Sequence, residues 1–126
     1  MKFAAVLWLV GWAFVGLPWR SFSAQPSFRN VRLVPFEGGS RVAYVLNVLA
    51  FVPCGMIGVG LGWSASRAVL SGTAISVSTE FLQLFSRRRF PTTTDVILNS
   101  LGTAIGAGLG AAGRRQRKSL HGPSTM

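Results

Sequence analysis

Four long apolar runs, separated by shorter polar segments, dominate the hydropathy pattern of the chain. They cover residues 3–19, 42–63, 68–85 and 96–113. Each has close to the ~20 residues that an α-helix needs to cross the hydrocarbon core of a bilayer, where a helix satisfies its own backbone hydrogen bonds. The pattern therefore predicts an all-α fold, a polytopic four-helix transmembrane bundle. We expect one domain, residues 1–113, followed by a basic polar tail, 114–126, that is disordered.

The first apolar run, residues 3–19, has two interpretations. Lys2 precedes it and the small-residue segment 21–24 follows it, an arrangement that resembles a secretory signal peptide. Trp19 and Arg20, in contrast, are typical of a retained helix that ends at a membrane interface. We favour the retained helix and keep the signal peptide as the alternative.

Composition and charge agree with a membrane location. Charged residues make up 13% of the chain, whereas a soluble domain typically carries about 25%. The net charge of +10 does not indicate nucleic-acid binding, because the basic residues form short runs between apolar stretches. The orientation stays open, since four spans place six basic residues on one side of the membrane and seven on the other.

Polar residues interrupt the apolar runs at membrane depth. Glu80 and Gln83 share a helical face in the third run, and Asp95 and Asn99 share one at the start of the fourth. Ionisable groups are costly in hydrocarbon, so Glu80 and Asp95 are functional candidates by default. Asn47 and Asn99 fit a hydrogen bond between helices as well as they fit a functional role. We expect a polar site inside the bundle.

Glycines recur at every fourth position of the fourth run, at Gly102, Gly106 and Gly110. This spacing predicts a face on which another helix packs closely, because small residues let two backbones approach, and it permits a homo-oligomer. Cys54 is the only cysteine and His121 the only histidine. The sequence therefore predicts neither a disulfide within the chain nor a metal site, and we expect no cofactor.

Taken in order, these residues resemble the VanZ-like family of bacterial envelope proteins. Residues 78–85 match the family pattern S-x-E-x-x-Q-x-F, and Arg89 follows at the place of the family's arginine. Residues 95–102 match D-x-x-x-N-x-x-G, residues 47–55 match N-x-x-x-F-x-P-x-G, and residues 33–36 match L-x-P-F. The resemblance implies a multi-pass protein of the bacterial inner membrane, from a family linked to teicoplanin resistance, and leaves the reaction open.

One departure from the family pattern bears on its chemistry. Thr92 and Thr94 stand where many relatives carry Asp. Asp95 is therefore the only carboxylate of the third loop, which argues against a metal or cation role there.

We expect a non-catalytic protein that binds membrane lipids or a lipid-linked envelope precursor. The candidate ligand-binding residues are Asn47, Glu80, Gln83, Arg89, Asp95 and Asn99. In this interpretation Arg89 holds a lipid phosphate and also folds back towards Glu80, with Gln83 as a bridge. Two alternatives stay open. One is an intramembrane enzyme, although the sequence shows no nucleophile–base pair; the other is a small transporter or channel subunit with Glu80 as an ion site.

Overall fold

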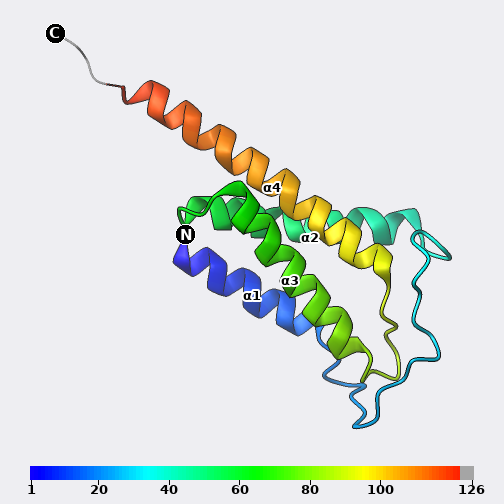
Figure 1. The fold of residues 1–126 in the computed structure, drawn as a ribbon. Coiled ribbons are helices and arrows are strands. Elements are labelled where there is room, and N and C mark those ends of the chain that lie inside the picture. Colours follow the sequence, from blue (N-terminus) through cyan, green and yellow to red (C-terminus); the bar gives the residue numbers. More distant parts are fainter. Residues whose placement is uncertain (123–126) are drawn as a thin grey trace.

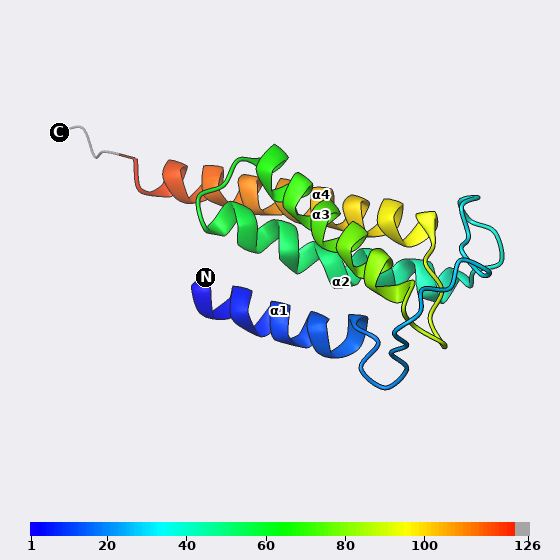
Figure 2. The ribbon, with the colours of Figure 1, turned by 60° about the horizontal axis from the view of Figure 1, so that its bottom comes forward.

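The structure, a computed structural model, describes residues 1–122, which form four helices and no strand (Figure 1). The helices are α1 (Lys2–Gly16), α2 (Arg41–Gly60), α3 (Ala65–Gln83) and α4 (Thr93–Leu120). Consecutive helices run in opposite directions. The α1–α2 and α3–α4 loops therefore lie at the same end of the molecule, which we call the loop end (Figures 1 and 2). The prediction of an all-α fold with four helices is confirmed.

Local sequence signals explain where three of the helices begin. Ser40, Ser64 and Thr92 each precede a helix, and their hydroxyl oxygens accept hydrogen bonds from backbone N–H groups of the first turn. These caps satisfy N–H groups that have no partner within the helix. After α2 the chain reverses through a turn in which Gly62 has a φ of 100°, a left-handed conformation that glycine adopts at low cost.

Most helix ends lie a few residues from the boundaries that hydropathy predicts, and two of the differences have a clear local cause. α1 ends at Gly16 rather than at residue 19, because Pro18 has no backbone N–H and disfavours a helical conformation in the residue before it. α4 continues to Leu120, so the part of the expected disordered tail from 114 to 120 is helical. Arg, Gln and Lys are good helix formers, which explains the extension. Positions 123–126 of that tail lie outside the described residues.

The most extensive helix contact joins α2 and α4, and glycines bring the two backbones together. A methyl group added at Gly106 would meet the carbonyl oxygen of Val52, and one at Gly102 would meet that of Val48. Gly55 of α2 approaches the α4 backbone in the same way. The glycine face of α4 is therefore occupied by α2 of the same chain.

Two tryptophans attach α1 to the rest of the bundle. Trp8 Nε1 donates a hydrogen bond to the carbonyl oxygen of Ala50 at 2.9 Å, and Trp12 Nε1 donates one to Thr79 Oγ1 at 3.2 Å. Both indole rings also pack edge-on against Phe51, with centroid distances of 5.5 and 4.6 Å. Phe51 is fully buried. In the structure α1 thus packs on the core residue Phe51, and its retention, rather than its cleavage as a signal peptide, stays a prediction.

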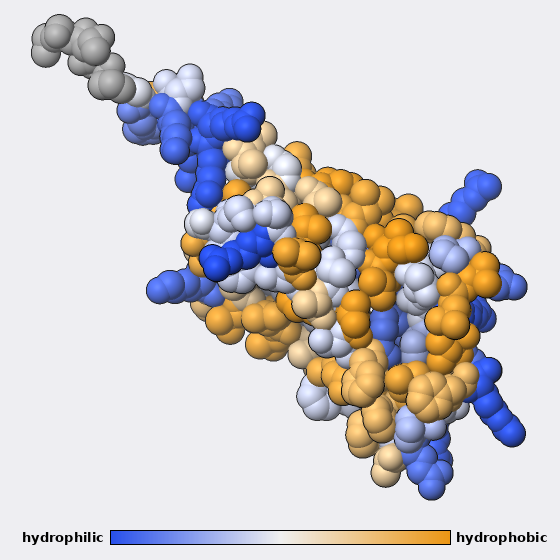
Figure 3. Space-filling view, viewed as in Figure 1, coloured by the Kyte–Doolittle hydropathy of each residue, from blue (hydrophilic) through white to orange (hydrophobic). Residues whose placement is uncertain are grey.

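The distribution of side chains is inverted relative to that of a water-soluble protein. The buried hydrophobic residues of the described chain are few, namely Phe51, Val59, Ala68, Leu98 and Ala107, whereas large hydrophobic residues on all four helices are exposed. Figure 3 shows these apolar side chains covering much of the visible face of the bundle. In water such a surface is unfavourable.

Two of the helices are long and apolar enough to cross a membrane, namely α2 and α4. In the most apolar segment of each of these two helices, most residues are not buried by the rest of the protein. The core helices of a soluble domain are, in contrast, mostly buried. α1 has only 15 residues and is about 22 Å long at ~1.5 Å per residue. α3 is interrupted by serine and threonine residues along its length.

The two loops at the loop end hold each other in place. The α1–α2 loop, residues 17–40, crosses the α3–α4 loop, residues 84–92, through backbone hydrogen bonds. Ser23 N donates to the carbonyl oxygen of Phe85 at 2.6 Å, and Arg32 N donates to that of Pro91 at 3.0 Å. The long first loop is therefore ordered by tertiary contacts, although it contains no helix or strand.

Candidate functional site

The polar residues of α3 and α4 meet along the interface of these helices. Asn99 Nδ2 donates a hydrogen bond to Ser76 Oγ at 2.8 Å, and the hydroxyl groups of Thr73 and Ser100 lie 2.8 Å apart. Ser76 and Asn99 are both buried. These pairs are hydrogen bonds between helices, which is the structural role that the sequence left open for Asn99.

Glu80 lies nearer the loop end of the same interface. Its side chain is 8% exposed, and Oε2 accepts a hydrogen bond from the backbone N–H of Thr92 at 2.7 Å. Thr92 in turn caps α4 by accepting a hydrogen bond from Asp95 N at 3.1 Å. Glu80 therefore ties the end of α3 to the start of α4.

Asp95 joins α4 to α2. Its Oδ1 accepts a hydrogen bond from Asn47 Nδ2 at 2.6 Å. Asp95 also lies in the first turn of α4, where the positive end of the helix dipole favours a negative charge. The structure thus brings Asn47, Glu80 and Asp95, which belong to three different helices, to the loop end of the bundle.

Arg89, in the α3–α4 loop, is exposed and lies close enough to Glu80 and Asp95 for electrostatic attraction to both. The hydrogen bond to Glu80 comes from the Thr92 backbone, where the sequence had suggested Arg89 as the direct partner. Gln83 is buried, at 7% exposure, on the side of α3 that holds Glu80. The expected bridge from Gln83 to Arg89 stays a prediction.

The structure adds residues that the sequence interpretation missed. Thr92 and Thr94 stood out only as departures from a family pattern. In the structure Thr92 caps α4, and Thr94 Oγ1 accepts a hydrogen bond from Phe36 N at 2.7 Å, which anchors the first loop. The spacing of Thr92 and Asp95 is that of a capping box, so this role was visible in the sequence. Residues 33–36, the L-x-P-F element, are thereby placed beside the site.

Asn99 has an unusual feature for a residue within the bundle. Its Oδ1 is buried and has no hydrogen-bond partner among residues 1–122. Buried polar atoms are usually satisfied. Since its Nδ2 is bound to Ser76, the free oxygen is one unused acceptor one turn deeper than Asp95.

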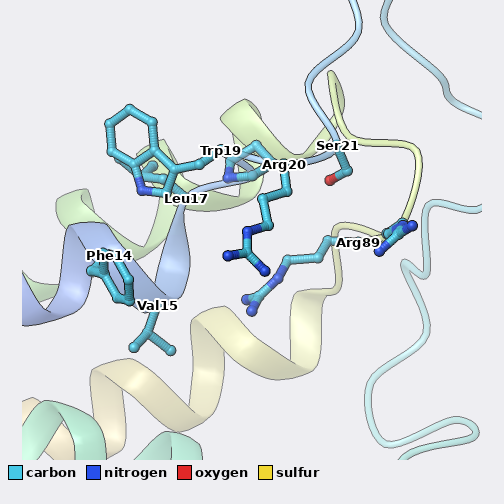
Figure 4. Close-up of a pocket in the computed structure, with 9 residues that line it drawn as sticks. Phe14, Val15, Leu17, Trp19, Arg20, Ser21 and Arg89 are labelled. Carbon is cyan, nitrogen blue, oxygen red and sulfur yellow. The ribbon is translucent and has the colours of Figure 1, made fainter.

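A basic cavity of about 550 Å³ lies at the loop end, and Arg89 is one of its lining residues. Arg20, Arg88 and Arg89 line it together with Trp19 and Ser21. Figure 4 shows the side chains of Arg20 and Arg89 extending towards each other from the two loops. Arg20 was assigned from sequence only as a residue at a helix end, because it lies far from Arg89 along the chain.

Comparison with known proteins gives one result. A family model described as VanZ/LLP1 matches residues 3–112, nearly the whole of the described chain. The resemblance to the VanZ-like family is therefore confirmed. No curated protein and no solved structure matches the chain. Together with the two long apolar helices, the family match indicates a membrane protein.

Proposed function

The chain belongs to the VanZ/LLP1 family, and from that premise we propose that it is a multi-pass protein of the bacterial cell membrane that binds a lipid or a lipid-linked envelope precursor. The observation that carries the proposal is the inverted distribution of side chains. Large hydrophobic residues face outward on all four helices, while Glu80, Gln83 and Asn99 are buried between the helices. An apolar exterior suits lipid, and the polar residues between the helices offer hydrogen-bonding groups for a headgroup.

All four helices are included in this membrane bundle. α3 illustrates the reason, because Leu70, Val77 and Phe81 are exposed whereas Ser76 and Glu80 are buried. Its polar stripe faces the protein, and its apolar stripe is left for acyl chains. α1 is short for a complete span, which a tilt of its neighbours or local thinning of the bilayer accommodates at modest cost.

The carboxylates have unused capacity for a ligand. Glu80 and Asp95 each accept one hydrogen bond from a neighbouring helix or loop, whereas an ionised carboxylate offers about four acceptor positions. Hydroxyl groups of a glycerol, sugar or sugar phosphate are donors that match these positions. Arg89 beside the two carboxylates supplies a cation for a phosphate.

The proposal is tested by extracting the protein in native nanodiscs and quantifying the retained lipids by mass spectrometry. We expect one lipid or lipid-linked sugar to be enriched over the bulk membrane, and Asp95→Ala to lose at least half of that enrichment. Ser78→Ala is the matched control, because Ser78 is exposed and bonds only within its own helix. A wild-type lipid profile identical to that of the bulk membrane would overturn the proposal.

The same experiment separates binding from catalysis. Conversion of the enriched lipid during incubation of the purified protein would instead support an intramembrane enzyme, with Glu80 and Asp95 as candidate acid and base. A role in teicoplanin resistance, which the family resemblance implies, follows if the bound lipid controls access of the drug to the membrane surface. Loss of resistance in Asp95→Ala, with normal protein levels, is the expected result in cells.

A further inference from the structure

The basic cavity at the loop end is lined by positive charges without a negative one, which favours the binding of an anion. Three of its lining residues, Arg20, Arg88 and Arg89, carry guanidinium groups, and no Asp or Glu is among the residues that line it. Like charges held close together repel one another. The guanidinium groups of Arg20 and Arg89 extend towards each other across this space (Figure 4), so they are positioned to share one anion.

The arginines are brought together by a fixed arrangement of the two loops. Arg87 N donates a hydrogen bond to the carbonyl oxygen of Ser21 at 3.0 Å, and the Ser21 and Ser86 hydroxyl groups lie 2.8 Å apart. The backbone at Arg20 is therefore held close to the backbone at Arg88 and Arg89. Arginines that only set membrane topology have no need of such a connection.

The wall of the cavity opposite the arginines is apolar. Phe14, Val15 and Leu17 line it, and Figure 4 shows Phe14 and Val15 on α1 facing the same space as the arginine side chains. A second hollow of about 280 Å³ adjoins the cavity and shares Leu17, Pro18 and Trp19 with it. Phe22 and Leu82 complete this hollow, whose walls are almost entirely apolar.

The combination of arginines with an apolar hollow favours a lipid phosphate over free phosphate as the ligand. Free phosphate would use only the guanidinium groups, which bind phosphate oxygens in a bidentate manner. A lipid would use both the guanidinium groups, which bind its phosphate, and the apolar hollow, which holds its acyl chain. Trp19 and Arg20 also follow the end of α1, and Trp and Arg are typical of helix ends at the headgroup layer, the depth at which lipid phosphates are found.

We infer that the cavity between the two loops binds the phosphate group of an anionic lipid through Arg20 and Arg89, with the lipid chain against Leu17, Pro18 and Leu82. The inference rests on the proposed function and names the class of ligand. Arg89 belongs to both the cavity and the carboxylate site. A phosphate held by Arg89 therefore places the rest of the headgroup within reach of Glu80 and Asp95.

The test uses the full chain in a zwitterionic detergent and two probes, dihexanoyl phosphatidic acid and inorganic phosphate, titrated by calorimetry. We expect the lipid to bind at least tenfold more tightly than inorganic phosphate. Arg20→Ala and Arg89→Lys should each weaken lipid binding about tenfold or more, because a charge-assisted hydrogen bond is lost or its bidentate geometry is changed. Arg67→Ala, at the opposite end of α3, is the matched control and should leave the affinity unchanged.

A further variant tests the contribution of the apolar hollow alone. Leu82→Trp fills the hollow and should weaken binding of the lipid but not of inorganic phosphate. Equal affinities for the two probes, unchanged by Leu82→Trp, would mean that the cavity binds free phosphate and would overturn the lipid assignment. Arg20→Gln is included with a thermal melt, so that a loss of binding caused by unfolding of Arg20→Ala is recognised; wild-type affinity in a folded Arg20→Gln would also overturn it.

The outcomes distinguish this inference from the proposed function. If the wild-type protein retains an enriched native lipid and Arg20→Gln retains it equally, the cavity is not the phosphate site, although the proposed function stands. If the wild-type protein enriches no lipid, the proposed function fails, and the inference fails with it.

Discussion

α4 packs against two neighbours in two different ways. Against α2 it presents glycines, so that backbone meets backbone at Gly102 and Gly106. Against α3 it presents side chains that hydrogen-bond, with Asn99 bound to Ser76. The first interface depends on backbone contact and tolerates no added volume at these two glycines. The second combines polar pairs, each of modest worth in a membrane, with the packing of the Thr103 side chain on Gly72. The closely packed interface holds α4 in place, and the polar one leaves Asn99 Oδ1 without a hydrogen-bond partner among the described residues.

The largest effect is expected where the backbones are closest. Gly106→Leu places a bulky side chain against the Val52 carbonyl oxygen, so that α2 and α4 must separate. We expect a loss of about 3 kcal/mol or more, since overpacking of this kind has no free space to relax into. Gly108→Leu is the control, because nothing lies within 4 Å of an added Cβ there. Equal melting temperatures in detergent would contradict the described packing.

Glu80 tests the polar interface between α3 and α4. Glu80→Leu leaves the Thr92 N–H without its acceptor at the start of α4, and an unsatisfied buried donor costs about 1–3 kcal/mol. Glu80→Gln keeps an acceptor oxygen and should lose clearly less stability. Thermal melting of both variants checks the order, which would be reversed if Glu80 faced lipid.

The Asn47–Asp95 pair tests whether the loop end depends on a cross-link between α2 and α4. Asn47→Leu removes the hydrogen bond to Asp95 and leaves that carboxylate with its remaining neighbours only. We expect a loss of about 1–2 kcal/mol, and protease sensitivity of the 84–92 loop should rise. Limited proteolysis of Asn47→Leu beside Ser78→Ala gives the comparison, and identical cleavage rates would count against the cross-link.

The smallest effect concerns the hydrogen bond between Asn99 and Ser76. Membrane hydrogen bonds of this kind are worth ~0.6 kcal/mol on average. A double-mutant cycle of Asn99→Ala and Ser76→Ala should give a coupling energy near that value. A coupling above about 2 kcal/mol would mean that the α3–α4 interface is as demanding as the α2–α4 interface, and the contrast between them would be lost.

The two ends of the molecule carry similar numbers of basic residues but use them differently. At the loop end Arg20, Arg88 and Arg89 line one cavity. At the other end Arg114 and Arg117 lie on the exposed last turns of α4, which extend beyond the other helices (Figures 1 and 3). The count of basic residues on the two sides is nearly equal, so it does not decide the orientation.

The sequence determined the features that depend on neighbouring residues. Apolar runs predict the helices because helical hydrogen bonds are local, and the four-residue glycine spacing predicts a packing face because such positions lie on one side of a helix. Among the boundaries that the hydropathy pattern misplaced are the ends of α1 and α4. Pro18 ends α1 early, and the helix-forming residues after 113 extend α4 although they are polar.

Only the tertiary structure decided which polar residues are in contact with one another. Asp95 is paired with Asn47, Glu80 with the Thr92 backbone, and Arg20 lies beside Arg89. These partners are distant in the chain, and no local pattern chooses between several polar residues on several helices. The choice follows from the direction in which each helix runs and from the close packing of α2 on the glycines of α4. That packing fixes the depth of Asn47 relative to Asp95.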